Sequence, residues 1–245
     1  MRRVLFRWRS LTIWSYPAML YVGLVLGIVA GNIAAHAAGL DALRIYIATL
    51  VLIVPALIGA RLLFVASEWK TYRRNPRRIW NRNEGGFMMY GAVPVMLLCS
   101  VPVLRRLHLS FGAFWDVSTF TILIGMIFTR VGCLLNGCCG GRATQSWFGI
   151  RLPNTHGVWQ KRVPTQALEA GCAAVLLGLA MFLWRRTPFP GALFLLITLS
   201  YASVRLVLEL VRERTGRERQ FRVAYALSVI LVLSSLSALA LNWRR

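Results

Sequence analysis

The chain has 245 residues, of which 57% are hydrophobic and 15% are charged, and its formal net charge is +21. Soluble domains are closer to half apolar and carry more charge, so this composition excludes an ordinary soluble protein, including a soluble nucleic-acid binder. Because the arginines flank long apolar runs, anionic phospholipid is a simpler partner for the positive charge than nucleic acid.

Seven apolar segments approach the roughly 20 residues that are needed to cross a bilayer. We therefore predict an all-α integral membrane protein with one transmembrane domain over residues 1–245 and a polar site built from loops and helix ends on one face. The seven predicted transmembrane helices cover residues 14–37, 43–66, 87–104, 116–136, 166–184, 189–211 and 222–242.

Three polar loops and the N-terminus carry most of the positive charge. The loops cover residues 67–86, 137–165 and 212–220, and seven spans would place all three on the same membrane face as the N-terminus. This face has 19 of the 29 basic residues, so the positive-inside rule would locate it in the cytoplasm. Arginines that bind substrate phosphates would distort the count, because the candidate sites lie on this same face.

Charged residues inside or at the ends of the predicted spans mark a candidate site. Arg130 ends the apolar run TFTILIGMIF, and Arg61 interrupts the second span. Arg205 and Glu209 are four residues apart, so they share one helix face, which Arg212 also joins. Charges at such positions are costly unless they are paired. The pattern indicates either an ion pair that locks two helices together or a clamp for a phosphate group.

The start of the fifth span adds a second acidic candidate. Glu169 lies near the beginning of this span and Glu84 precedes the third, positions where acidic side chains favour helix formation. Gln166 is close enough to the helix start to cap free backbone donors. Arg162 is either an anchor at the membrane interface or a further phosphate ligand.

The segment between Arg130 and Arg142 combines three cysteines, one asparagine and four glycines at a membrane boundary. This composition is typical of a site for a lipid headgroup, or of small residues that permit close helix packing. Its C-x4-C-C pattern could offer three thiolates to a metal, but zinc sites usually show two separated pairs or a paired histidine. No histidine has ligand spacing here, so we expect neither a metal nor a cofactor.

Taken in order, these residues resemble the prolipoprotein diacylglyceryl transferases, integral enzymes of bacterial lipoprotein maturation, from about Tyr16 to Glu209. The segment TRVGCLLNGCCGG is similar to the family signature G-R-x-G-N-F-x-N-x-E-x-x-G, and the matching residues are Arg130, Gly132, Asn136 and Gly141. RVPTQALE, residues 162–169, matches R-x-P-[ST]-Q-x-x-E, and residues 205–209 match R-x-x-x-E.

Three residues depart from the family pattern. Tyr90 replaces a histidine, Cys133 replaces an asparagine, and Cys138 replaces a glutamate. We therefore interpret the chain as a member of a divergent, cysteine-rich branch.

The resemblance implies transfer of a diacylglyceryl group from phosphatidylglycerol to the thiol of a lipobox cysteine in a prolipoprotein, with release of glycerol phosphate. It also implies a multi-pass protein of the bacterial inner membrane, whose active face lies outside the cytoplasm, against the arginine count. The implied catalytic residues are Arg130, Arg205, Glu209, Tyr90 and Glu169. The implied substrate-binding residues are Tyr16, Glu84, Asn136, Cys138, Gly141, Arg142 and Arg162.

In this reaction guanidinium donors would stabilise the anionic leaving group. Tyr90, Glu169 or Glu209 would accept the proton of the thiol. Two alternatives stay open: a related enzyme that acts on another lipid or acceptor, and a non-catalytic protein that binds or transports phospholipid.

Overall fold

The computed structural model describes residues 4–8, 11–80, 86, 88–153, 158–212 and 218–243. Glu84 therefore lies outside the described residues. The described chain is dominated by long helices that correspond to the seven predicted spans: α1 (Ser15–Ala37), α2 (Ala42–Ser67), α4 (Met89–Arg106), α5 (Phe111–Asn136), α6 (Thr165–Leu183), α7 (Ala192–Leu210) and α8 (Glu218–Trp243).

Six of these helices are long and apolar enough to cross a membrane, with mean hydropathies of 1.7 to 2.3. The chain is thus an all-α, multi-pass membrane protein. The remaining long helix, α4, has 18 residues and ends in Arg105 and Arg106. It is not among the six, so the count of seven spans stays a prediction.

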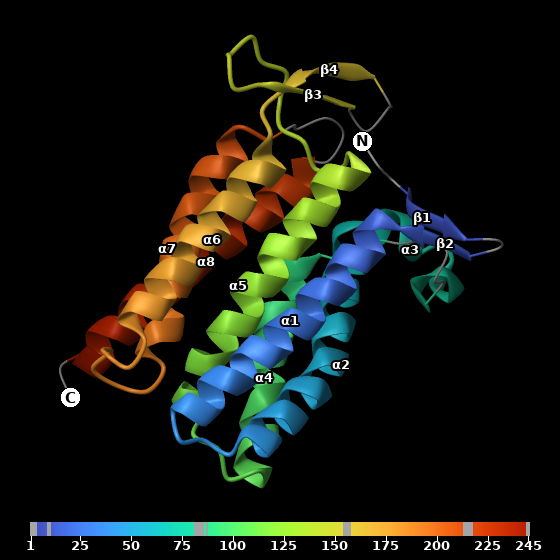
Figure 1. Cartoon of the computed structure of the whole chain (residues 1–245). Coiled ribbons are helices and arrows are strands. Elements are labelled where there is room, and N and C mark those ends of the chain that lie inside the picture. The colour runs from blue at the N-terminus through green and yellow to red at the C-terminus, as the bar shows by residue number, and fades with distance from the viewer. Residues whose placement is uncertain are drawn as a thin grey trace.

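The short elements gather at one end of the helix bundle (Figure 1). They are two antiparallel hairpins and two short helical turns: β1 (Val4–Trp8) with β2 (Leu11–Trp14), α3 (Trp69–Tyr72), the 3-10 helix η1 (Pro76–Trp80), and β3 (Ile150–Pro153) with β4 (Trp159–Arg162). The C-terminal end of α8 lies at the opposite end of the bundle. The described residues of the first two polar loops and of the N-terminal region thus lie at the same end of the bundle, and their location on one face of the membrane stays a prediction.

Small residues let α1 and α5 approach closely. Gly23, Gly27 and Gly31 recur every four residues on one face of α1, and a Cβ added at Gly27 would lie 2.7 Å from the carbonyl oxygen of Thr121. The Thr121 hydroxyl donates a 2.8 Å hydrogen bond to the Gly27 carbonyl. Without a hydrophobic force between helices in lipid, such close contacts and interhelical hydrogen bonds supply much of the packing energy.

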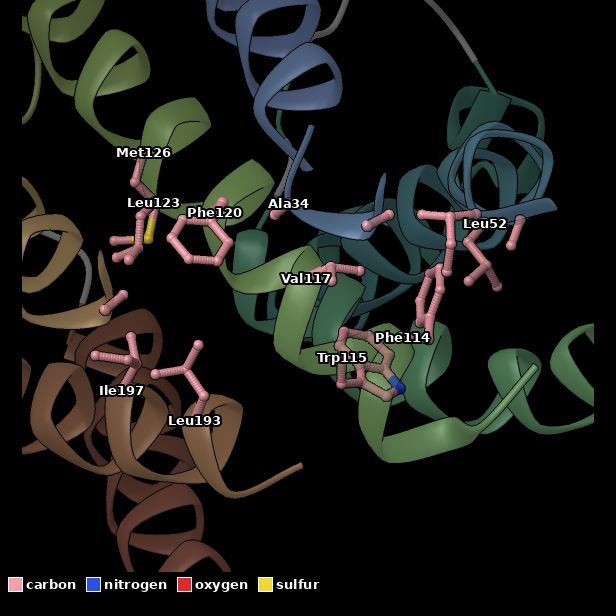
Figure 2. Packing of buried hydrophobic residues seen from close by; sticks show 14 of the residues in the cluster. Ala34, Leu52, Phe114, Trp115, Val117, Phe120, Leu123, Met126, Leu193 and Ile197 are labelled. Carbon is pink, nitrogen blue, oxygen red and sulfur yellow. The ribbon is translucent and has the colours of Figure 1, made fainter. Parts of the chain in front are cut away.

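Helix α5 lies at the centre of the bundle and contributes the largest part of the apolar core. Figure 2 shows Phe120, Leu123 and Met126 of α5 beside Leu193 and Ile197 of α7, all of them buried. Because α5 is fixed against neighbours on several sides, the residues at its C-terminal end are held in defined positions.

Two buried charges serve the fold. Asp116 of α5 accepts hydrogen bonds from the backbone amides of Gly191 (2.7 Å) and Phe194 (2.9 Å), so it caps the start of α7 from a different helix. Arg61 of α2 faces the protein, and its guanidinium donates to the carbonyls of Ile79 (2.9 Å) and Gly86 (3.0 Å). Arg61 is therefore buried within the protein.

Candidate functional site

A single carboxylate joins the ends of three helices. Glu169, in the second turn of α6, has a fully buried side chain. One of its oxygens forms an ion pair with Nε of Arg130 on α5, and the other with Nη1 of Arg205 on α7. Arg130 and Arg205 are 75 residues apart in the sequence, so the fold brings together the two arginines that the sequence singles out.

A second carboxylate extends this cluster along α7. Glu209 lies one helical turn after Arg205, and its Oε2 is 3.1 Å from Nη2 of Arg205. The same oxygen is 3.6 Å from Nη1 of Arg212, just beyond the end of the helix. The predicted common face of these three residues is therefore confirmed.

Tyr90 of α4 contacts the remaining nitrogen, Nε, of the Arg205 guanidinium group. Nε of Arg205 donates a 2.8 Å hydrogen bond to the phenolic oxygen of Tyr90. That oxygen also lies 3.0 Å from the hydroxyl of Ser228 on α8, which is buried. Arg205 is thus oriented by groups from α4, α6 and its own helix.

The cluster carries a positive charge in a largely buried place. Three guanidinium groups and two carboxylates leave one net positive charge. The Arg205 side chain is 3% exposed, and that of Arg130 is 12% exposed. An unbalanced charge so far from water is costly, and an anionic ligand would offset that cost.

Two buried polar groups beside the cluster have no partner among the described residues. The hydroxyl of Tyr201 lies one turn before Arg205 on α7, and the carbonyl oxygen of the Gln166 side chain lies one turn before Glu169 on α6. Buried polar groups are almost always hydrogen-bonded, so each of these has capacity left for a bound molecule. The sequence alone does not single out Tyr201 or Ser228, since neither breaks the apolar pattern of its helix.

The chain after α5 folds back against the start of α6. Gly137 ends α5 in the left-handed conformation (φ 74°), as glycine does at many helix ends. The Gln166 side-chain nitrogen donates a 2.6 Å hydrogen bond to the carbonyl of Cys138, and the Thr165 hydroxyl donates a 2.8 Å hydrogen bond to that of Cys139. The expectation that Gln166 caps free backbone donors is wrong, because its side-chain oxygen accepts no hydrogen bond from the described residues and its side-chain nitrogen donates to a carbonyl of this turn.

Gly141 lies between two other backbone segments. Its amide donates to the carbonyl of Val163 (2.9 Å), and it forms an isolated bridge with Arg212. An added Cβ would be 2.8 Å from the Val163 carbonyl oxygen and 2.9 Å from that of Val211. The match to the family signature at this position therefore has a steric reason.

The two arginines among the implied substrate-binding residues, Arg142 and Arg162, differ in their surroundings. Arg162 is buried at the end of β4, where it donates to the carbonyl of Gly141 and to the side chain of Gln160, both at 3.1 Å. Arg142 is exposed. Arg162 thus supports the turn, whereas Arg142 is open to an approaching ligand.

Tyr16 and Asn136 line the same end of the bundle. Tyr16, in the first turn of α1, packs against Gly132, where an added Cβ would lie 3.4 Å from the tyrosine. Asn136 is the last residue of α5 and is half-buried. Of the proposed site residues, Glu84 alone lies outside the described part of the chain.

The three cysteines of the signature segment form a compact group. The sulfur atoms of Cys133, Cys138 and Cys139 all lie within 4.8 Å of one another. Hydrogen bonds from the Cys133 and Cys138 thiols lower the pKa of Cys139, and the nearby guanidinium groups of Arg212 and Arg130 lower it further. The sequence shows the three thiols but not that their sulfur atoms converge, because this depends on how the chain turns back after α5.

Comparison with known proteins bears on the activity of this site. The family model described as prolipoprotein diacylglyceryl transferase matches residues 3–241. A phosphatidylglycerol–prolipoprotein diacylglyceryl transferase of Dehalococcoides mccartyi is 30% identical over 190 residues, which is 76% of this chain and 72% of the relative. Proteins of the same name from Clostridium tetani and Chloroflexus aggregans are each 25% identical, covering 86% and 94% of this chain and 86% and 85% of the relatives.

Proposed function

The chain belongs to the prolipoprotein diacylglyceryl transferase family, and from this we propose that it transfers a diacylglyceryl group from phosphatidylglycerol to the thiol of a lipobox cysteine. It is a membrane transferase of lipoprotein biosynthesis. The acceptor cysteine, the roles of individual residues and the location in the bacterial inner membrane are parts of the proposal.

The observation that carries the proposal is the convergence of Arg130 and Arg205 on Glu169. The reaction releases a phosphate monoester, so negative charge grows on a phosphate oxygen as the bond to the glyceryl carbon breaks. Guanidinium donors already oriented in a water-poor site stabilise such charge without having to reorganise. The net positive charge of the cluster suits the phosphate of the donor lipid.

The bonds formed and broken in the proposed transfer step balance. The sulfur of the acceptor forms a bond to the terminal glyceryl carbon, and the bond between that carbon and its phosphate oxygen breaks with both electrons on the oxygen. The thiol proton ends on the released glycerol phosphate. Arg130 and Arg205 bind the phosphate, and the unpartnered Tyr201 hydroxyl can donate to it.

Removal of the proton from the acceptor thiol is the step to which the groups of the ion cluster are least suited. Both oxygens of Glu169 are engaged by guanidinium groups, and Glu209 is paired with Arg205 and Arg212. A carboxylate that gives up an ion pair to accept a proton leaves a buried cation without its partner. We therefore assign Glu169 and Glu209 to positioning of the arginines, and Tyr90 to positioning of Arg205.

The described residues that we propose for substrate binding lie at the same end of the bundle as this cluster. Arg142 is exposed and suits the glycerol phosphate headgroup, whereas Tyr16, Asn136 and Gly141 shape the turn beside it. We further propose that this end faces away from the cytoplasm, with the C-terminal end of α8 on the cytoplasmic side. Reporter fusions at the two termini measure this orientation, and an extracytoplasmic C-terminus contradicts it.

The function is tested with purified full-length protein, labelled phosphatidylglycerol and a lipobox peptide. We expect a thioether product and glycerol phosphate in equal amounts. Arg130→Ala and Arg205→Ala should each abolish product while the protein still elutes as a folded species. Arg186→Ala is the matched control. Arg186 lies in the segment after α6, is exposed, and stacks on the ring of Phe182 in the last turn of α6. Full activity in both site variants would overturn the proposal.

A further inference from the structure

The cysteine group of the α5 turn has the geometry of a metal site. Cys133 is in the last turn of α5, and Cys138 and Cys139 follow the left-handed Gly137. Their three sulfur atoms lie within 4.8 Å of one another, and among the described residues they form the one group of three or more potential metal ligands. Two sulfurs bound tetrahedrally to zinc at ~2.3 Å are separated by about 3.8 Å, so small side-chain rotations suffice to bind an ion.

The turn is held in place by its surroundings. The carbonyls of Cys138 and Cys139 accept hydrogen bonds from Gln166 and Thr165 at the start of α6. Cys139 has a positive φ of 63°, which is uncommon for a residue with a Cβ. Such a conformation persists only where the surrounding structure determines it, and it occurs often at ligand sites. Here it directs the Cys139 side chain toward the other two sulfurs.

The charge around the group fits a metal-thiolate complex. A divalent cation bound by three thiolates has a net charge of −1, and the guanidinium groups of Arg130 and Arg212 act electrostatically on Cys139. Arg130 precedes Cys133 by three residues and lies on the same face of α5. The group is therefore next to the ion cluster that would bind the lipid phosphate.

Whereas the residue spacing alone leads us to expect no metal, from the convergence of the three sulfur atoms we propose that Cys133, Cys138 and Cys139 bind one zinc ion and leave its fourth position open for the thiol of the acceptor cysteine. Catalytic zinc sites have three protein ligands and one exchangeable position, whereas structural sites are closed by a fourth. Of the histidines in the described part of the chain, His36 lies in the last turn of α1 and His108 lies two residues after the end of α4, so neither belongs to this turn. Cys139 is exposed, which gives an incoming thiol access to the site.

This inference deepens the proposed function and rests on it for the role of the fourth ligand. A thiol that coordinates zinc loses its proton outright, and the resulting thiolate is the nucleophile that the transfer requires. The sulfur then forms the carbon–sulfur bond, the carbon–oxygen bond breaks toward the phosphate, and the released proton neutralises the phosphate monoester. Zinc undergoes no change of oxidation state. The metal would supply the acid–base function that the engaged carboxylates do not offer.

Metal binding is tested on the full-length protein in detergent, first freed of metal under reducing conditions and then titrated with Co²⁺. We expect about one ion per chain with the sulfur-to-cobalt absorption of a tetrahedral thiolate site, and displacement by Zn²⁺. Cys139→Ser should weaken binding by at least tenfold, about the loss seen when an outer-shell partner is removed. The matched control is the double variant Cys99→Ala/Cys172→Ala, which removes two cysteines of the spans and should bind as the parent protein does.

The fourth position is tested by adding a lipobox peptide to the cobalt protein. The cysteine peptide should change the cobalt spectrum, and a serine peptide should not. Three results would overturn the metal site. They are the absence of any metal uptake by the protein, uptake of as much metal by a variant with all three cysteines replaced by serine as by the parent protein, and a disulfide within the group in freshly isolated protein. A cobalt spectrum that the cysteine peptide leaves unchanged would refute the proposal that the fourth coordination position is open.

The test separates this inference from the proposed function. Thioether formation by metal-free protein would refute the role of zinc and leave the transfer intact. Metal uptake without any thioether product from phosphatidylglycerol would refute the transfer and leave the metal site intact.

Discussion

The phenolic oxygen of Tyr90 on α4 accepts a 2.8 Å hydrogen bond from Nε of Arg205 on α7, across 115 residues of sequence. The guanidinium plane of Arg205 is therefore fixed from three directions, since Glu169 and Glu209 engage its two terminal nitrogens. A tyrosine in this place acts on the reaction through the arginine that it orients.

Tyr90→Phe should lower kcat by about tenfold, because a hydrogen bond to a charged group contributes roughly 1.5–3 kcal/mol, part of which the remaining partners of Arg205 retain. The KM for phosphatidylglycerol should change less than kcat. Initial rates of thioether formation at several lipid concentrations measure both. The shape of the pH–rate profile should be unchanged, since a positioning residue does not give or take the proton; a lost basic limb would instead identify Tyr90 as the base.

Glu169→Gln should cost about 3–5 kcal/mol of stability, because it breaks a buried pair and leaves two guanidinium groups facing a neutral amide. Thermal unfolding in detergent measures the loss, which should be visible as a lower Tm. Asp41→Asn is the control. Asp41 pairs with Arg44 at 2.9 Å, but both side chains are nearly half exposed, so this change should cost at most about 1 kcal/mol. Equal Tm values for the two variants would contradict the central role of Glu169.

The sequence predicts the helices well because membrane spans depend on long apolar runs. Each predicted span corresponds to a long helix, with differences of a few residues at the ends. The i,i+4 spacing of Arg205 and Glu209 correctly predicts their shared face, since that relationship is local. The charge of Glu169 is equally visible in the sequence, but its two arginine partners are not.

The features that the sequence does not predict depend on the direction of the chain after a helix. The cysteine group forms because Gly137 and Cys139 both have positive φ values and so turn the backbone toward the end of α5. Asp116 likewise looks like an isolated acid within a span, although it accepts a hydrogen bond from the amide of Gly191, 75 residues later, at the start of α7. Neither the handedness of a turn nor a contact at such a separation is encoded in local periodicity.

Arg61→Lys should loosen the polar segment after α2 without removing positive charge. The guanidinium of Arg61 donates to the carbonyls of Ile79 and Gly86, and it stacks 5.6 Å from the ring centre of Phe64. Lysine has no planar fork of donors, so it cannot bond both carbonyls in this way. We expect faster amide hydrogen exchange over residues 68–80 with no change in α6. Uniform acceleration across the whole chain would point to global destabilisation instead.

Gly141→Ala should disrupt the junction between the α5 turn, β4 and the end of α7. An added methyl group would lie 2.8 Å from the Val163 carbonyl oxygen and 2.9 Å from that of Val211, and backbone atoms on both sides cannot rotate away. Overpacking of this kind costs about 1–3 kcal/mol. Gly125→Ala on α5 is the matched control, because nothing lies within 4 Å of its added Cβ, and alanine favours helix over glycine by about 1 kcal/mol. Chemical unfolding in detergent should therefore show that Gly141→Ala lowers the free energy of unfolding and that Gly125→Ala raises it.

The activity of the two variants should also differ, because Gly141 positions Arg212 and the carbonyl that accepts a hydrogen bond from Arg162. Only Gly141→Ala should reduce thioether formation. Equal activity in both variants would show that the site tolerates a displaced junction.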